Sequence, residues 1–422
     1  MRRIFYNSGP IAHMSNFDTK SIKEEDFVCK NVLEKNQAIV ISDNIIEKII
    51  PSEEAFEEYG EQSHKNLEFV DLKNKAIIPG LVDSHTHLLW AGDRSREVSW
   101  RMRGLSYQEI ANMGGGINYT VNRTRNASKI ELHALGIRRL SNALKHGTTH
   151  LEAKSGYGLT TDSELKLLEV AKTLEEVENV PSITHTWLGA HAIPDGLTRQ
   201  EYVEDILSEQ LPSVLDQGIA EHADVFCEDG WFTTEEAEDI LTSARLGGLE
   251  LRLHIDEFKD CSGGELAAKL NVRSADHAHY TSKDGREAMT NSGVNTGFLP
   301  GTPYAMGEPW PDFKQMVSDE HQFSFGSDFN PNCRTLSLPF MGTIAVQRCG
   351  LHPLIALGAV TVNPAKTLER KDGLEQGKLT NGAVANFNIL NSPFWESWAL
   401  QPGMSPIEST VLCGELIPHN ND

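Results

Sequence analysis

The feature that most constrains the fold of this sequence is a regular alternation of short apolar runs and helical patterns across residues 79–372. Strands that are separated by helices pair in parallel through crossover connections. Eight such units predict an α/β fold of the (β/α)8 TIM-barrel type. The eight candidate strands are LVDSHTH, THLEAKSG, SITHTWLGAH, DVFCEDG, LRLHIDE, SADHA, VNTGFLP and FSFGSD.

Helix signals lie between these runs. Residues 129–146 place apolar side chains close to helical spacing. Thr161 and Glu164 have the spacing of a capping box, which predicts that a helix begins there. The same spacing at Thr233 and Glu236 predicts another helix start. A doubly wound sheet is the alternative architecture, but it needs a glycine-rich turn after its first strand, where this chain has SHTHLLW.

The two ends of the chain carry a different, β-rich pattern. Short β-like runs lie at 38–42, 45–50, 76–80, 382–390 and 409–417. The acidic segment 51–66 between two of them has little periodicity and is predicted to be a loop. We expect residues 1–78 and 373–422 to form one small β-sandwich-like domain beside the barrel of residues 79–372.

Composition excludes several classes of partner. Sixty acidic residues against 38 basic ones give a formal net charge of −22, which opposes binding to nucleic acid or anionic membranes. The sequence contains no run of about 18 apolar residues, so no membrane span is expected. The six cysteines form no C-x-x-C pair, which favours a reduced chain in the cytoplasm. A small anionic substrate would need a local cationic group.

Chemically capable residues follow several of the predicted strands. His85 and His87 are two residues apart, so on a strand their side chains point the same way. His254 and Asp328 follow the fifth and eighth strands, and a TIM barrel gathers such strand ends at one active face. A lone histidine is more often a hydrogen-bonded structural residue. Three imidazoles and one carboxylate together suit Zn²⁺ or Fe²⁺ and leave room for a water molecule.

Three side chains are candidates for the chemistry beside such a metal. Asp328 can accept the proton of the attacking water, and His277 can hold and polarise the attacking oxygen. Glu257, three residues after His254, can donate a proton to a ring nitrogen. The alternative for Glu257 is a solvated carboxylate at the start of a loop.

A second metal would need a bridging ligand on the fourth strand. Lys154 is a possible bridge by residue type, but the strand count places it on the second strand. Glu228 lies on the fourth strand, and a metal ion bound by Glu228 would contradict a single-metal site.

Nine segments of the chain carry a family resemblance: PGLVDSHTHLLWAGDRS, GGGI, EAKSGYGL, LGAHAIP, DVFCEDGWF, LHIDEF, SADHA, LPGTPY and GSDFNP. With them the chain resembles the amidohydrolase superfamily and, within it, the imidazolonepropionase family of histidine degradation. The resemblance extends over nearly the whole chain. H-x-H is shared by many hydrolases, whereas AGDRS, KSGYGL, GAHAIP and DVFCEDG together are far more specific.

The resemblance implies hydrolytic opening of the ring of 4-imidazolone-5-propanoate to N-formimidoyl-L-glutamate. It also implies one Zn²⁺ or Fe²⁺/Fe³⁺ ion per subunit, a cytoplasmic location and a homodimer. The family's metal ligands match His85, His87, His254 and Asp328. Its substrate contacts match Arg94, Tyr107, Tyr157, His191, Glu257 and Asn330.

The expected substrate carries a propanoate tail, and the Arg94 guanidinium can bind a carboxylate through two hydrogen bonds. Tyr107 and His191 can add hydrogen bonds to the tail. The alternatives are a surface ion pair for Arg94 and loop packing for Tyr107 and Tyr157. The glycine run at 114–116 is predicted to be a flexible loop near the mouth of the barrel.

One departure from the family pattern follows SDFNP. The family has a glycine and then a small hydroxyl residue, whereas this chain has Asn332 and Cys333. Asparagine tolerates a positive φ better than most residues, but a thiol is only a weak hydrogen-bond donor. The change puts a product contact near Asn330 in doubt.

Two other functions compete with this one. The spacing of His254 and Glu257, together with His277 and Asp328, also resembles deaminases of nucleobase-like rings, although a neutral base does not need Arg94. A metal-free barrel that serves as a binding scaffold is the third hypothesis, and the complete set of ligands argues against it.

Overall fold

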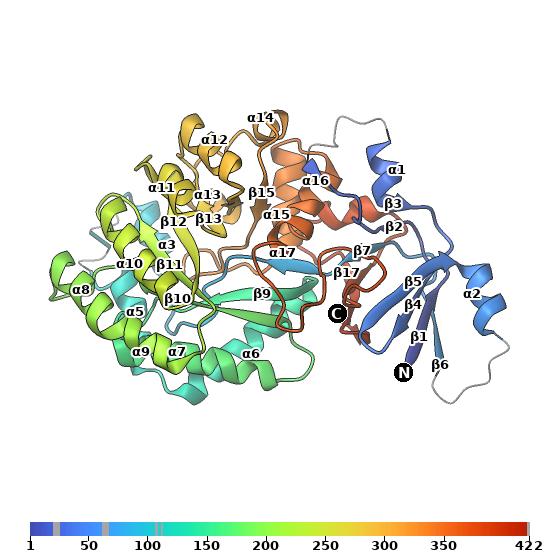
Figure 1. Ribbon diagram of the computed structural model, residues 1–422, viewed down its shortest axis with the longest axis horizontal. Coiled ribbons are helices and arrows are strands. Elements are labelled where there is room, and N and C mark those ends of the chain that lie inside the picture. Colours follow the sequence, from blue (N-terminus) through green and yellow to red (C-terminus); the bar gives the residue numbers. More distant parts are fainter. Residues whose placement is uncertain (20–25, 61–66, 106–108, 111–112, 420–422) are drawn as a thin grey trace.

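The centre of the computed structural model is an eight-stranded parallel sheet whose strands follow one another in sequence order (Figure 1). The structure describes residues 1–19, 26–60, 67–105, 109–110 and 113–419. A bridge between Thr86 and Phe329 joins the first strand's end to the last and nearly closes the barrel. All eight predicted strands are confirmed: β8 (Leu81–Asp83), β9 (Thr148–Lys154), β10 (Ser182–Ala190), β11 (His222–Cys227), β12 (Glu250–Ile255), β13 (Ser274–His277), β14 (Asn295–Phe298) and β15 (Phe323–Phe325).

Helices surround the barrel and connect its strands. Within the described ranges, no helix is both long and apolar enough to cross a membrane. The helices are α1 (Phe27–Asn31), α2 (Ser52–Tyr59), α3 (Glu97–Met102), α5 (Gly116–Asn126), α6 (Lys129–Lys145), α7 (Thr161–Thr173), α8 (Arg199–Asp205), α9 (Leu211–Gln217), α10 (Thr234–Leu246), α11 (Gly263–Leu270), α12 (Lys283–Ser292), α13 (Gly301–Met306), α14 (Phe313–Ser318), α15 (Leu338–Thr343), α16 (Pro353–Gly358) and α17 (Val362–Ala365).

One of the two predicted capping boxes is present. Thr233 accepts a hydrogen bond from the Glu236 N–H, and the Glu236 side chain accepts one from the Thr233 N–H. The box predicted at Thr161 is wrong, because Glu164 turns to the loop at 156–159 instead. There its carboxylate accepts three backbone N–H groups at 2.7–2.8 Å. A buried carboxylate is more stable with several donors than with one.

The chain termini form two further sheets that pack face to face. Phe5 and Phe387, one from each sheet, meet edge to face with ring centroids 5.3 Å apart. The blue N-terminal and red C-terminal strands lie side by side in Figure 1. The smaller sheet has the order β5 (Ile45–Pro51), β4 (Gln37–Ser42), β1 (Arg2–Tyr6), β6 (Leu67–Asp71). The larger has the order β18 (Glu415–Pro418), β17 (Ile407–Leu412), β16 (Phe387–Leu390), β7 (Ile77–Pro79), β2 (Ile11–Ala12), β3 (Val32–Leu33).

This arrangement fits the predicted β-rich unit built from both ends of the chain. The domain boundaries at 78/79 and 372/373 stay a prediction. The loop predicted for 51–66 is wrong in its first part, where α2 forms, and 61–66 lies outside the described residues. Ala55 and Tyr59 are four residues apart, so they share one helix face and are buried against Ala38 and Val40.

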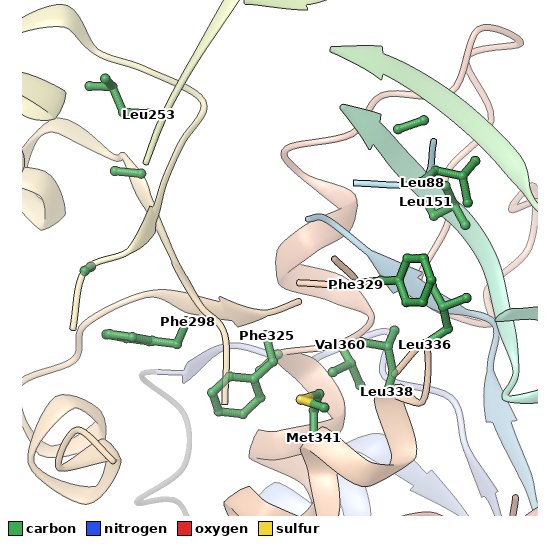
Figure 2. Close-up of a cluster of buried hydrophobic side chains, with 14 of the residues drawn as sticks. Leu88, Leu151, Leu253, Phe298, Phe325, Phe329, Leu336, Leu338, Met341 and Val360 are labelled. Atoms are coloured by element: carbon green, nitrogen blue, oxygen red, sulfur yellow. The ribbon is translucent and has the colours of Figure 1, made fainter. Parts of the chain in front are cut away.

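The main hydrophobic core lies between the barrel strands and the helices that surround them. Figure 2 shows Phe325 of β15 beside Val360, Leu338 and Met341, which lie on the segments that follow this strand. The Phe325 ring also meets Phe313 edge to face at 5.1 Å. This packing holds the end of β15 in place, directly before the polar residues that follow it.

Candidate functional site

Four side chains predicted as metal ligands lie at the carboxyl ends of the barrel strands. His85 and His87 follow β8, and His254 lies near the end of β12. Asp328 follows β15. One donor atom from each of the three histidines lies within 4.8 Å of the others, and all four side chains are buried. Burial lowers the pKa of His85 and His87 well below the ordinary value, so both are neutral, as metal ligands must be.

Two of these imidazoles are oriented by carboxylates behind them. The His85 Nδ1 lies 2.7 Å from Asp276 Oδ2. The His254 Nδ1 lies 3.0 Å from Asp224 Oδ2. An ionised carboxylate only accepts hydrogen bonds, so each Nδ1 carries the proton and each Nε2 presents a lone pair. Both Nε2 atoms are buried and lack a hydrogen-bond partner in the part of the chain that the structure describes. This donor set fits a divalent metal ion.

Asp328 is held beside the histidines in an unusual backbone conformation. Its Oδ1 lies 3.6 Å from His85 Nε2 and 3.7 Å from His87 Nε2. Thr302 donates a hydrogen bond of 2.5 Å to its Oδ2. Asp328 has a φ of 47°, in the left-handed region that non-glycine residues rarely adopt. Such strain concentrates at functional sites, where the surrounding structure enforces it.

A layer of buried charges contacts the carboxylates that orient the ligands. The Lys154 Nζ lies 2.5 Å from Asp224 and 2.8 Å from Glu152. The Arg252 guanidinium lies 3.0 Å from Glu152 and 3.2 Å from Asp276. These side chains are at most 1% exposed. Two cations, Lys154 and Arg252, therefore form ion pairs with three carboxylates. Lys154 lies on the second strand, as counted from the sequence, and its role there is that of an ion-pair partner.

Glu228, the predicted alternative for a second metal, binds backbone groups. Its Oε2 accepts hydrogen bonds from the N–H groups of Glu257 at 2.7 Å and Phe258 at 3.2 Å. The Cys261 thiol donates to its Oε1 at 3.5 Å. Glu228 belongs to none of the metal-competent donor groups among the described residues. It fixes the turn that carries Glu257.

Glu257 and His277 face each other beside the ligand cluster. The Glu257 Oε2 lies 3.7 Å from His277 Nε2, and the His277 and His85 rings are 5.5 Å apart. His277 has a φ of 67°. Burial raises the pKa of Glu257 well above its ordinary value, and the charges of Asp328 and Glu228 act in the same direction. A protonated carboxyl group can act as a general acid, and a non-ligand imidazole can hydrogen-bond an oxygen.

A cavity adjoins these two residues at the ends of β13 and β14. Its wall is mainly apolar and includes Phe258, Tyr280 and Met306, with Glu308 among its polar groups. Largely apolar cavities with a few polar groups are typical of small-molecule sites.

Tyr157 and His191, predicted substrate contacts, pack against the ligand His87. The His191 ring stacks on His87 with centroids 4.9 Å apart, and the Tyr157 ring lies 5.6 Å from His87. The His191 Nδ1 donates to the Gly156 carbonyl at 2.8 Å. A β-carbon at Gly156, where φ is 96°, would lie 2.9 Å from that nitrogen, so this position needs glycine.

Arg94 is buried and forms a bidentate ion pair with Glu97, with both N–O distances at 2.8 Å. It is therefore an ion-pair residue, but not on the surface. Glu97 also accepts the Gly116 N–H. The loop predicted for 114–116 is wrong at its last residue, because Gly116 begins α5. Tyr107 lies outside the described residues.

The segment after Asp328 folds back on itself. The Asn330 side chain donates to the Asp328 carbonyl at 2.9 Å and accepts the Asn332 and Cys333 N–H groups. Asn332 is exposed, and its φ is not positive, so asparagine's tolerance of that conformation is not used. The Cys333 thiol is buried against Gly301. Burial, together with the nearby charge of Asp328, raises the pKa of the Cys333 thiol to about 12. The contacts of Asn332 and Cys333 with substrate stay predictions.

Sequence reasoning missed the residues that support this site. Asp224 lies inside β11, Arg252 lies inside β12 two residues before His254, and Thr302 follows LPG. Their signal is the appearance of charged or hydroxyl residues inside otherwise apolar strands and turns, where burial demands a partner. Glu97 was missed because its only signal is its i+3 spacing from Arg94.

Comparisons with known proteins give full-length relatives. No protein-family model matches the chain. A Clostridium tetani protein named imidazolonepropionase is 36% identical over 417 residues, 98% of this chain and 97% of the relative. One from Geobacillus sp. strain WCH70 is 35% identical over 426 residues, 99% and 98% of the two chains. A Xenopus tropicalis protein named probable imidazolonepropionase is 32% identical over 413 residues, 95% and 94% of the two chains.

Solved structures show the same fold in more distant proteins. Enamidase, described as a member of the amidohydrolase superfamily, matches with a TM-score of 0.61 and 15% identity, over 100% of this chain and 97% of its own. Guanine deaminase from C. acetobutylicum matches with a TM-score of 0.65 and 17% identity, over 99% and 100%. At these identities the likeness concerns the fold.

Proposed function

The chain belongs to the imidazolonepropionase family, and from this premise we propose that it hydrolyses a ring C–N bond of 4-imidazolone-5-propanoate to give N-formimidoyl-L-glutamate. The observation that carries the proposal is the donor cluster at the barrel mouth, with Glu257 and His277 at its edge. A cyclic amide needs an activated water and a proton for the leaving nitrogen, and this arrangement offers groups for both.

The proposed cofactor is one metal ion per subunit, Zn²⁺ or Fe²⁺/Fe³⁺, held by His85, His87, His254 and Asp328. The buried nitrogens without partners and the carboxylates behind two of them support this assignment. When bound, such an ion lowers the pKa of a water molecule, so that hydroxide is available near neutral pH. The neighbouring carboxylates are already engaged in ion pairs with Lys154 and Arg252, which favours one ion over two.

Two side chains carry the proposed proton transfers, and a third holds the attacking oxygen. The water oxygen bonds to the ring carbonyl carbon, and the bond from that carbon to the ring nitrogen breaks. Asp328 accepts the proton that the attacking water loses. Glu257 gives its proton to the leaving nitrogen, and His277 hydrogen-bonds the attacking oxygen. The 3.7 Å separation of Glu257 and His277 lets both reach one small ring.

Substrate binding is proposed to depend on a cation, Arg94. Arg94 takes the propanoate carboxylate, since a guanidinium offers paired N–H donors. Tyr157 and His191, which pack on the ligand His87, contact the ring or its tail. The other proposed contacts rest on the family resemblance alone: Tyr107, Asn330, Asn332 and Cys333.

Two incubations test the proposal. The protein is mixed with 4-imidazolone-5-propanoate, and the ultraviolet absorbance of the ring and the mass of the product are followed. A parallel sample receives guanine, adenine or cytosine and is assayed for ammonia, because the fold is shared with a guanine deaminase. We expect ring opening, no ammonia release, and no ring opening by His254→Ala. Ammonia from a base without opening of the imidazolone would establish the deaminase instead.

The family also implies an assembly and a compartment. We propose a homodimer in the cytoplasm. Analytical ultracentrifugation that gives a monomer mass of 46.8 kDa rather than twice that mass would contradict the dimer.

A further inference from the structure

Arg94, the proposed receptor of the substrate carboxylate, is itself held by a buried carboxylate. The Glu97 oxygens lie 2.8 Å from Arg94 Nε and Nη2, and the two side chains are 5% and 4% exposed. Burial alone would raise the pKa of Glu97, but the hydrogen bonds and charge of Arg94 lower it below its ordinary value. Glu97 engages two of the five guanidinium N–H groups, and a bidentate pair has a fixed geometry. Arg94 is therefore oriented before any ligand arrives.

The same carboxylate has a third partner. Its Oε1 accepts the Gly116 N–H at 2.9 Å, so Glu97 of α3 also fixes the start of α5. The preceding Gly115 lies against this contact. A β-carbon there would be 2.9 Å from Glu97 Oε1 and 2.8 Å from a methyl carbon of Ile110. Because Gly115 has no side chain, the Glu97 carboxylate has room at this position.

We infer that Glu97 is a positioning residue that sets the preference for a carboxylate-bearing substrate, by holding the Arg94 guanidinium in one orientation within the space left by Gly115. This inference rests on the proposed function, because it takes the substrate propanoate as the ligand of Arg94.

Removing the charge of Glu97 has two opposite effects on the affinity of Arg94 for a carboxylate. Which effect is larger shows whether Glu97 positions Arg94. Without Glu97 one negative charge beside the guanidinium is lost, which by itself would strengthen binding of an anion. Without Glu97 the guanidinium also loses its orientation, which weakens paired hydrogen bonding. If Glu97 positions Arg94, the second consequence is the larger one. If Glu97 competes with the substrate for Arg94, the first is the larger.

The experiment compares two ligands that differ only in the carboxylate, imidazole-4-propanoate and 4-propylimidazole, as inhibitors of the metal-loaded enzyme. For Glu97→Gln we expect the inhibition constant of imidazole-4-propanoate and the KM of the substrate to rise roughly tenfold, the scale of one charge-assisted hydrogen bond, with kcat little changed. The inhibition constant of 4-propylimidazole should not move. Glu97→Asp, which keeps the charge, should recover part of the loss.

A glycine pair supplies the matched control. Gly115→Ala should shift carboxylate binding in the same direction as Glu97→Gln, because its new methyl group displaces the Glu97 carboxylate. Gly114→Ala is strained by its φ of 76°, yet none of the residues that the structure describes has an atom within 4 Å of the added carbon, so it should leave carboxylate binding unchanged. A general loss of fold would weaken both inhibitors and lower the melting temperature.

Two results would overturn the inference, and they are distinguishable. If Arg94→Ala weakens imidazole-4-propanoate but Glu97→Gln binds it as tightly as wild type or more tightly, Glu97 does not position Arg94. If Arg94→Ala itself leaves imidazole-4-propanoate unaffected, the proposed role of Arg94 fails and this inference fails with it.

Discussion

Asp224 lies behind His254, with its Oδ2 3.0 Å from the imidazole Nδ1, and thereby fixes which ring nitrogen faces the ligand cluster. In Asp224→Asn the side-chain amide can donate to Nδ1, which would move the ring proton to Nε2 and block the metal-binding lone pair. We expect the metal affinity to fall by roughly 10- to 100-fold, as for other carboxylates that orient ligand histidines. Competition with a chelator measures it. Asp239→Asn, on the outer helix α10, is the control, and equal affinity in both variants would contradict the role of Asp224.

Arg94→Ala should raise the KM of the carboxylate-bearing substrate while leaving the metal in place. Loss of one partner from a buried, charge-assisted contact costs at least about 2 kcal/mol, so we expect the KM to rise roughly 30-fold or more. Steady-state kinetics and elemental analysis of the same preparation measure both quantities. Arg103→Ala, an exposed arginine nearby, should behave as wild type. An unchanged KM in Arg94→Ala would remove Arg94 from the proposed binding site.

Much of this architecture is readable from the sequence because its signals are local. Parallel barrel strands are buried on both faces, so they appear as apolar runs, and the H-x-H motif spans only three residues. The pairing of His254 with Asp224 depends on register between neighbouring strands, which no local pattern encodes. Helix α2 was missed because its buried face includes only two apolar residues, Ala55 and Tyr59, within an acidic segment.

The same reason explains the error at Glu164. In a capping box the glutamate carboxylate accepts the N–H at the start of the helix, but other backbone N–H groups nearby can take its place. Here the loop at 156–159 supplies three such N–H groups to Glu164. Sequence spacing describes the possible partners within a helix, but it does not describe a loop that folds back onto the helix start.

Phe325→Ala tests the packing that holds the end of β15. Phe325 is fully buried and contacts aromatic and aliphatic neighbours on both sides (Figure 2). Its truncation should lower the free energy of unfolding by about 3–5 kcal/mol through lost burial and an unfilled cavity. Urea denaturation followed by circular dichroism measures this quantity. Phe394→Ala, at a side chain that is 66% exposed, should change it by less than about 1 kcal/mol.

His150 makes stability depend on pH below neutrality. Burial lowers its pKa to about 4, although the hydrogen bond with Gln376 opposes this shift. The unfolded chain, with a pKa near 6.5, binds the proton first, so stability is highest above that value and falls as the pH decreases toward 4. This single group should remove about 2 kcal/mol between pH 7.5 and pH 5. Urea denaturation across this range should show a shallower fall for His150→Gln, and parallel curves for the two proteins would show that His150 does not contribute.

The most direct test of the central claim is a metal titration of the stripped protein. Ring opening of 4-imidazolone-5-propanoate is followed by absorbance while Zn²⁺ or Fe²⁺ is added to chelator-treated protein. The four-ligand site predicts a rate near zero without metal that rises linearly and stops rising at one equivalent per chain. Full activity in metal-free protein, or a rise that continues to two equivalents, would contradict it.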